Sequence, residues 1–114
     1  MDIKETVTDR YILLSLEGSL DATQAPVVDA AIAAALAKGL PHLIFELGEL
    51  RYVASMGLRC FIVANKMVME RGGKLAFFRL NDNVRAVFDM AGFLKLFLVT
   101  DTLEAALERI GGVT

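Results

Sequence analysis

The chain has 114 residues, of which 55% are hydrophobic and 23% charged, and its formal net charge is -2. This length is sufficient for one core but not for two, so we expect residues 1–114 to form a single domain. The net negative charge and the dispersed Lys and Arg residues argue against a nucleic-acid partner, because phosphate binding needs clustered basic residues.

The high apolar content does not predict a membrane span, because charged residues interrupt every apolar run well before the roughly 18 residues that a spanning helix needs. The first residues lack a basic region followed by an apolar one, so we expect no secretory signal. The single cysteine, Cys60, cannot form an internal disulfide, which fits a reducing compartment. These features together favour a cytoplasmic protein.

The N-terminal part is expected to form two strands and a helix. Ile3–Val7 alternates loosely, as an edge strand does, and Tyr11–Glu17 shows a stronger strand pattern. Residues 18–21 then break that pattern. Asp21 or Thr23 is expected to cap the helix that follows. Its inward stripe would consist of Ala25, Val28, Ile32, Ala35 and Leu36.

The middle of the chain changes from a strand pattern to a helical one. His42–Leu47 is a short apolar run typical of a buried strand, and residues 48–51 are expected to form a loop. Ser55 is a candidate N-cap of the next helix. Gly57 lies in its first turn, where glycine costs roughly 1 kcal/mol against alanine, so we expect the close approach of a backbone, ligand or partner. The helical stripe would include Leu58, Phe61, Ile62, Asn65 and Met69.

The C-terminal part continues this alternation. Lys74–Arg79 is expected to be a strand, Asn81 to cap a helix, and Leu94–Val99 to be the last strand. Thr100 or Asp101 would cap a final helix. The order β β α β α β α β α predicts an α/β fold with parallel pairing, a mixed sheet of about five strands and about four helices.

Catalytic motifs are not evident. The Gly72-Gly73-Lys74 run lacks the earlier glycine of a phosphate-binding loop. His42 and Cys60 alone cannot make a closed zinc site, so neither a metal nor another cofactor is expected. Cys60 is interpreted as a small core side chain, because a nucleophilic role would need a nearby base. We therefore do not expect an enzyme acting through Cys60 or Ser55.

Three stretches carry a resemblance to a known family. They are residues 18–21 before an alanine-rich helix, residues 43–59 (LIFELGELRYVASMGLR) and residues 70–97 (ERGGKLAFFRLNDNVRAVFDMAGFLKLF). From about Tyr11 to Leu107, the chain resembles the STAS domain of bacterial anti-sigma factor antagonists. The resemblance implies the STAS fold and a partner-switching role. Such proteins bind an anti-sigma factor that is a serine kinase of the GHKL ATPase type, leave it when phosphorylated, and are restored by a PP2C-type phosphatase.

The resemblance also implies roles for single residues. The phosphoacceptor position matches Ser55, the Gly-Leu after it matches Gly57 and Leu58, and an acidic position at the partner surface matches Asp21. The expected partner-binding residues are Asp21, Ala54, Ser55, Met56, Gly57 and Arg59. Ala54 departs from the commonest pattern, which has Asp directly before the serine. The alternative is therefore a STAS interaction subunit of a transport or sensory assembly that is not phosphorylated.

A phosphate on Ser55 would add a charge of about -1.5 to -2 at a helix N-terminus. In the free protein we expect the amides of Met56 and Gly57, and Arg59 one turn on, to face that charge. In a close interface the same charge must lose its water or meet an acidic neighbour, which would weaken binding.

Overall fold

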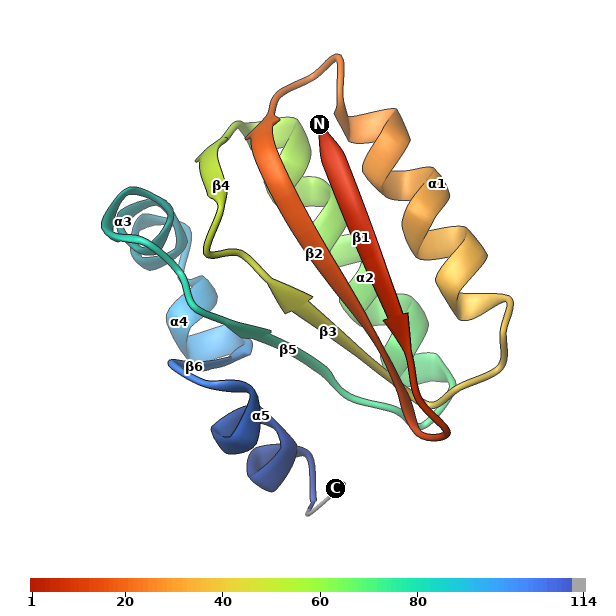
Figure 1. The fold of residues 1–114 in the computed structure, drawn as a ribbon. Helices are drawn as coiled ribbons and strands as arrows, with labels where there is room; N and C mark the ends of the chain where they lie inside the picture. The colour runs from red at the N-terminus through yellow and green to blue at the C-terminus, as the bar shows by residue number, and fades with distance from the viewer. Residues whose placement is uncertain (112–114) are drawn as a thin grey trace.

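The computed structural model describes residues 1–111, which are built around one mixed sheet (Figure 1). The strands are β1 (Asp2–Val7), β2 (Tyr11–Leu20), β3 (His42–Glu46), β4 (Leu50–Val53), β5 (Leu75–Phe78) and β6 (Leu98–Thr100). The helices are α1 (Ala25–Leu36), α2 (Ser55–Glu70), α3 (Asp82–Met90), α4 (Phe93–Leu96) and α5 (Leu103–Ile110). The predicted α/β class is confirmed, with six strands and five helices in residues 1–111.

The sheet has the order β1-β2-β3-β5-β6, and β4 pairs with β2 beyond the end of β3. β1 is antiparallel to β2, whereas the β2–β3, β3–β5 and β5–β6 pairs are parallel. A helix connects each of these parallel pairs, as the alternating pattern predicted. The edge position predicted for the first strand is confirmed.

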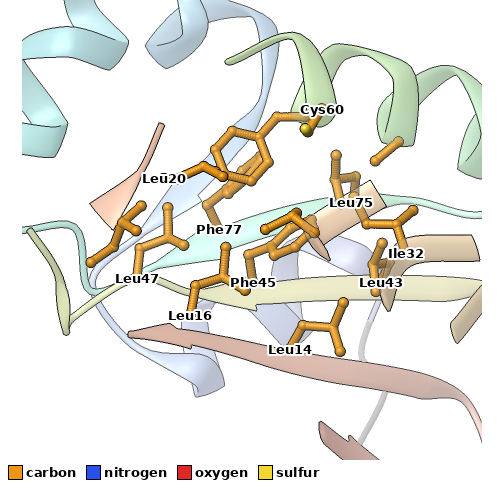
Figure 2. Packing of buried hydrophobic residues seen from close by; sticks show 14 of the residues in the cluster. Leu14, Leu16, Leu20, Ile32, Leu43, Phe45, Leu47, Cys60, Leu75 and Phe77 are labelled. Atoms are coloured by element: carbon orange, nitrogen blue, oxygen red, sulfur yellow. The ribbon is translucent and has the colours of Figure 1, made fainter. Parts of the chain in front are cut away.

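The larger core lies between the sheet and the helices α1 to α4. Leu16 of β2, Phe45 of β3 and Phe77 of β5 point toward the helices in Figure 2. The ring of Phe61, on α2, lies 5.1 Å from that of Phe45 and 5.0 Å from that of Phe77, both in edge-on geometry. Edge-on aromatic pairs are favourable beyond the area they bury, so this cluster fixes α2 against the middle of the sheet.

The opposite face of the sheet is covered by α5 (Figure 1). Ile44 of β3 and Ala76 and Phe78 of β5 pack there against Ala106 and Ile110. These strands are therefore buried on both faces, which explains why their sequences are continuously apolar rather than alternating.

Three predictions of local structure were wrong. Residues 18–20 continue β2, with a register shift between Gly18 and Ser19, and residues 50–53 form β4 rather than a loop. Neither segment shows a strand pattern by itself, and each is extended because its backbone pairs with that of the other. Residues 93–96 form the helix α4, because Phe93 and Phe97, four positions apart, both enter the core with rings 4.7 Å apart.

The helix ends agree in part with the predictions. Asn81 caps α3, its side-chain oxygen accepting from the Val84 amide, as predicted. α5 is capped by Thr102, not by Thr100 or Asp101. The buried face of α2 also differs from the predicted stripe. Ile62 and Met69 are 49% and 63% exposed, whereas the buried residues of that helix are Gly57, Cys60, Phe61, Ala64 and Val68.

Candidate partner-binding site

Ser55 is exposed to solvent at the first position of α2. The N-cap residue is Ala54, not Ser55 as predicted, and it makes no side-chain capping bond. The Ser55 hydroxyl makes no hydrogen bond within residues 1–111. It is therefore not occupied in holding the helix end and is available to another molecule.

The start of α2 is held in place by β2 and β4. The strands pair at Leu20 and Val53, and the Ala54 amide donates to the Leu20 carbonyl at 2.9 Å. Gly57 is buried against the same two side chains. A Cβ on Gly57 would lie 2.5 Å from Leu20 Cγ and 2.8 Å from Val53 Cγ2. The predicted close approach at Gly57 therefore comes from side chains of the sheet, and Gly57 lies beneath the surface that a partner could touch.

The free amides at this helix end differ from those expected. The amides of Gly57 and Leu58 both donate to the Ala54 carbonyl, at 2.9 and 3.0 Å. The amides of Ser55 and Met56 donate to no acceptor within the described residues. Because the first amides of a helix attract negative charge, Ser55 and Met56, rather than Met56 and Gly57, offer the free donors.

Asp21 lies at the same end of the sheet, because it directly follows Leu20, which pairs with Val53. One carboxylate oxygen accepts from the Thr23 hydroxyl at 2.7 Å and from the amides of Thr23 and Gln24 at 3.0 and 3.1 Å. The bond from the Thr23 hydroxyl, and then that from Gln24, lowers the pKa of Asp21. The N-cap position of α1 is Gln24, so Asp21 caps the turn before the helix rather than the helix itself.

A groove of about 490 Å³ separates α1 from α2 and begins beside Ser55 at Met56. Met56, Arg59, Val63 and Met67 of α2 line it, with Asp29 and Ile32 of α1 on the other side. Met56, Val63 and Met67 are 47%, 44% and 36% exposed. Val63 and Met67 were not among the predicted partner-binding residues, although positions 56, 59, 63 and 67 recur at helical spacing and mark a second, outer stripe.

Cys60 is 3% exposed and belongs to the larger core (Figure 2). Its thiol donates to the carbonyls of Met56 and Ala25 at 3.4 and 3.6 Å. Burial, followed by the nearby Asp29 carboxylate, raises the pKa of the thiol to about 12. The predicted core role is confirmed, and a thiolate nucleophile is disfavoured because the thiolate form is rare near neutral pH.

Neither a metal cluster nor a spanning helix is present in the described part of the chain. Residues 1–111 contain no group of three or more His, Cys, Asp or Glu side chains that could hold a metal ion. No helix in the same residues has both the length and the apolar character that crossing a membrane requires.

Comparison with known proteins shows the family. The STAS domain model matches residues 2–106. BtrV of Bordetella bronchiseptica is 34% identical over 98 residues, covering 86% of this chain and 84% of BtrV. The anti-sigma-B factor antagonist of Listeria monocytogenes is 34% identical over 92 residues, covering 81% of this chain and 80% of the relative.

The anti-sigma factor antagonist SpoIIAA of Bacillus has the same fold. In its unphosphorylated form it gives a TM-score of 0.83 at 21% identity, with 99% of each chain covered. In its phosphorylated form the TM-score is 0.73 at 21% identity, with 96% of this chain and 99% of SpoIIAA covered. The chain belongs to the STAS domain family. Its relatives in Listeria and Bacillus subtilis are anti-sigma factor antagonists, and the predicted family and fold are confirmed.

Proposed function

We propose that this protein is an anti-sigma factor antagonist that binds a GHKL-type serine kinase and is released when that kinase phosphorylates Ser55. A PP2C-type phosphatase would return it to the binding form. The observation that carries the proposal is the exposed, unbonded hydroxyl of Ser55 at the start of α2, in a chain whose relatives are anti-sigma factor antagonists.

Ser55 is the best acceptor among the serines of the chain. The other two, Ser15 and Ser19, lie within β2 and are only half-exposed, whereas Ser55 is exposed on a helix end. A kinase must bring the hydroxyl into line with a nucleotide phosphate, which a residue inside a paired strand cannot readily allow. The accessibility of Ser55 therefore supports its assignment.

The effect of a phosphate can be reasoned from the site. In the free protein the amides of Ser55 and Met56 are open to it, and Arg59 is four positions along the same helix, where side chains meet. In an interface that covers Ser55, a charge of about -2 would lose most of its water. A penalty of roughly 3 to 4 kcal/mol would weaken binding about 100- to 1000-fold.

The surface that would contact the kinase extends from Asp21 across Ser55 and Met56 into the groove between α1 and α2. Met56 and Met67 give it adaptable apolar side chains. Methionine and arginine are enriched in protein interfaces, and Arg59 lies in the same groove. Apolar contacts would supply affinity, and the charge state of Ser55 would control it.

We also propose that the protein acts by binding rather than by catalysis, and that it does so in the cytoplasm. The buried Cys60 thiol, with its pKa raised to about 12, supports the absence of thiol chemistry. A cytoplasmic location follows from the proposed partners, because a sigma-factor circuit operates where RNA polymerase is.

The test uses the cognate kinase, sought among the neighbouring genes, with ATP, mass spectrometry and calorimetric titration. We expect one phosphate, on Ser55, and at least about 100-fold weaker binding of the phosphorylated protein. The Ser55→Ala protein should bind like the wild type and remain unmodified, and Ser55→Glu should bind at least about 10-fold more weakly. Met90→Glu is the matched control. Met90 is 89% exposed on α3, so the substitution adds the same negative charge away from Ser55. Full affinity of the phosphorylated protein would refute the proposal.

The second candidate is a STAS interaction subunit that is not phosphorylated. It is favoured by Ala54, which puts a methyl group where the commonest family motif has a carboxylate beside the serine. Tight binding to the kinase that persists in the presence of ATP, with no phosphate found on Ser55 by mass spectrometry, would favour this candidate. Failure of both binding and phosphorylation with the cognate kinase would count against the first.

A further inference from the structure

A second pocket lies toward the other end of α2, where four parts of the chain meet. Its volume is about 520 Å³, and it is bounded by α2, the start of β5, α4 with the start of β6, and the end of α5. Most of its wall is apolar and consists of Met69, Leu75, Leu94, Leu96, Phe97 and Leu98. Of these, Met69 and Leu96 are large side chains left more than half exposed.

Three cationic side chains from separate elements also line this pocket. They are Lys74 before β5, Lys95 in α4 and Arg109 in α5. The residues that line it include no carboxylate, although acidic residues outnumber basic ones in the chain, 14 to 12. The ion pairs found within residues 1–111 involve Lys38, Arg79 and Arg85, and none of the three pocket cations.

A neighbouring histidine is consistent with an excess of positive charge here. The Lys74 amide donates to His42 Nδ1 at 3.1 Å, so His42 lies beside the pocket rim. Burial first, and then the positive charges of Arg10 and Lys74, lower the pKa of His42.

We propose that this pocket binds an anionic amphiphile, a molecule with a single alkyl chain that ends in a carboxylate or similar head group. The apolar wall matches the chain, and Lys74, Lys95 and Arg109 match the head. The volume lies within the range of about 300 to 1000 Å³ that is usual for small-molecule sites. A small inorganic anion would leave the apolar wall unused, and an uncharged chain would leave the cations without a counter-charge.

The test uses the whole chain without any kinase, so its outcome is independent of the proposed function. Decanoate, kept below its micelle concentration, is titrated against the ¹⁵N-labelled protein. We expect shifts to cluster at residues 73–75 and 94–98, and affinity to rise up to about fourfold for each methylene from octanoate to decanoate. Decanol and acetate, which keep only the chain or only the head, should both bind at least about 10-fold more weakly.

Two variants separate the pocket from general surface charge. The double variant Lys95→Glu with Arg109→Glu should bind decanoate at least about 10-fold more weakly than the wild type. Arg51 is a cation on β4 outside this pocket, so Arg51→Glu should bind decanoate with unchanged affinity. Circular dichroism confirms that each variant is folded. Equal affinity of both variants for decanoate would overturn the proposal. Binding only to phosphatidylglycerol vesicles, and not to monomeric decanoate, would also overturn it and indicate a membrane-surface contact.

Discussion

Replacing Gly57 by alanine should test how the start of α2 is held. The new methyl group would lie 2.5 Å from Leu20 Cγ, 2.8 Å from Leu20 Cδ2 and 2.8 Å from Val53 Cγ2. Ordinary contacts between carbon atoms are about 3.5 to 4.0 Å. Leu20 and Val53 are 0% and 4% exposed, so neither can turn into solvent to make room.

Two opposing effects set the magnitude. Overpacking of a filled core typically costs about 1 to 3 kcal/mol, and an overlap of about 1 Å against two buried side chains falls at the upper end. Alanine in place of glycine returns at most about 1 kcal/mol of helix propensity. We therefore expect the free energy of unfolding to fall by about 2 kcal/mol, and the melting temperature by about 8 °C.

Urea unfolding followed by circular dichroism measures this change. Ser55→Ala is the control, because the Ser55 side chain makes no hydrogen bond and its loss should change the free energy of unfolding by less than about 0.5 kcal/mol. Leu20→Ala, which is destabilising itself, removes the two clashing atoms of Leu20 and leaves Val53 Cγ2 in place. In that background Gly57→Ala should destabilise clearly less than it does in the wild type, because only the contact with Val53 remains. If it destabilises equally in both backgrounds, the contact with Leu20 is not the cause.

Three other outcomes follow from the structure. Gly73→Ala should lower the free energy of unfolding by about 3 kcal/mol or more, measured in urea, because its methyl group would overlap the Pro41 carbonyl oxygen, a backbone atom that cannot turn aside. Asn81→Ala should cost about 2 kcal/mol in the same assay, since Asn81 both caps α3 and donates to the Leu50 carbonyl of β4. Iodoacetamide should label Cys60 in urea but not in the native protein at pH 8.5. Folding raises the pKa of the Cys60 thiol from 9.0 to about 12, because the folded protein disfavours the thiolate. The contribution of the Cys60 thiol to the free energy of unfolding is therefore complete below pH 9 and is lost as the pH rises toward 12.

The elements with strong local patterns could be predicted from the sequence. The alternation of Tyr11–Glu17 and the apolar run at 42–47 correspond to β2 and β3, and the Asn81 cap is confirmed. The buried stripe of α1 agrees residue by residue with the prediction. In each case the neighbours along the chain contain the whole signal, because propensity and periodicity act over a few residues.

The missed elements depend on partners distant in sequence. Leu50–Val53 is too short to indicate a strand by itself, and it becomes one only by pairing with residues 18–20 of β2. In Leu94–Val99 the alternation suggested a strand, but the burial of Phe93 and Phe97 against Phe88 and Phe77 favours a helical turn. The outer apolar stripe of α2 was missed for a different reason, because no local pattern indicates which of the two apolar faces of this helix meets the sheet.

The candidate site shows most clearly the difference between features that local sequence predicts and features that depend on contacts between distant residues. Ser55 and Gly57 could be singled out locally, by a hydroxyl and a glycine at a helix start, but their roles were partly misassigned because Ala54 caps the helix and Gly57 packs inward. What exposes the Ser55 hydroxyl is the pairing of Leu20 with Val53 and the bond from the Ala54 amide to Leu20, contacts that join residues more than thirty positions apart. The loop that carries Asp21 follows directly from the same strand end. Asp21 and Ser55 are thus placed together by one pair of strands, so any change that separates β2 from β4 should disturb both residues at once.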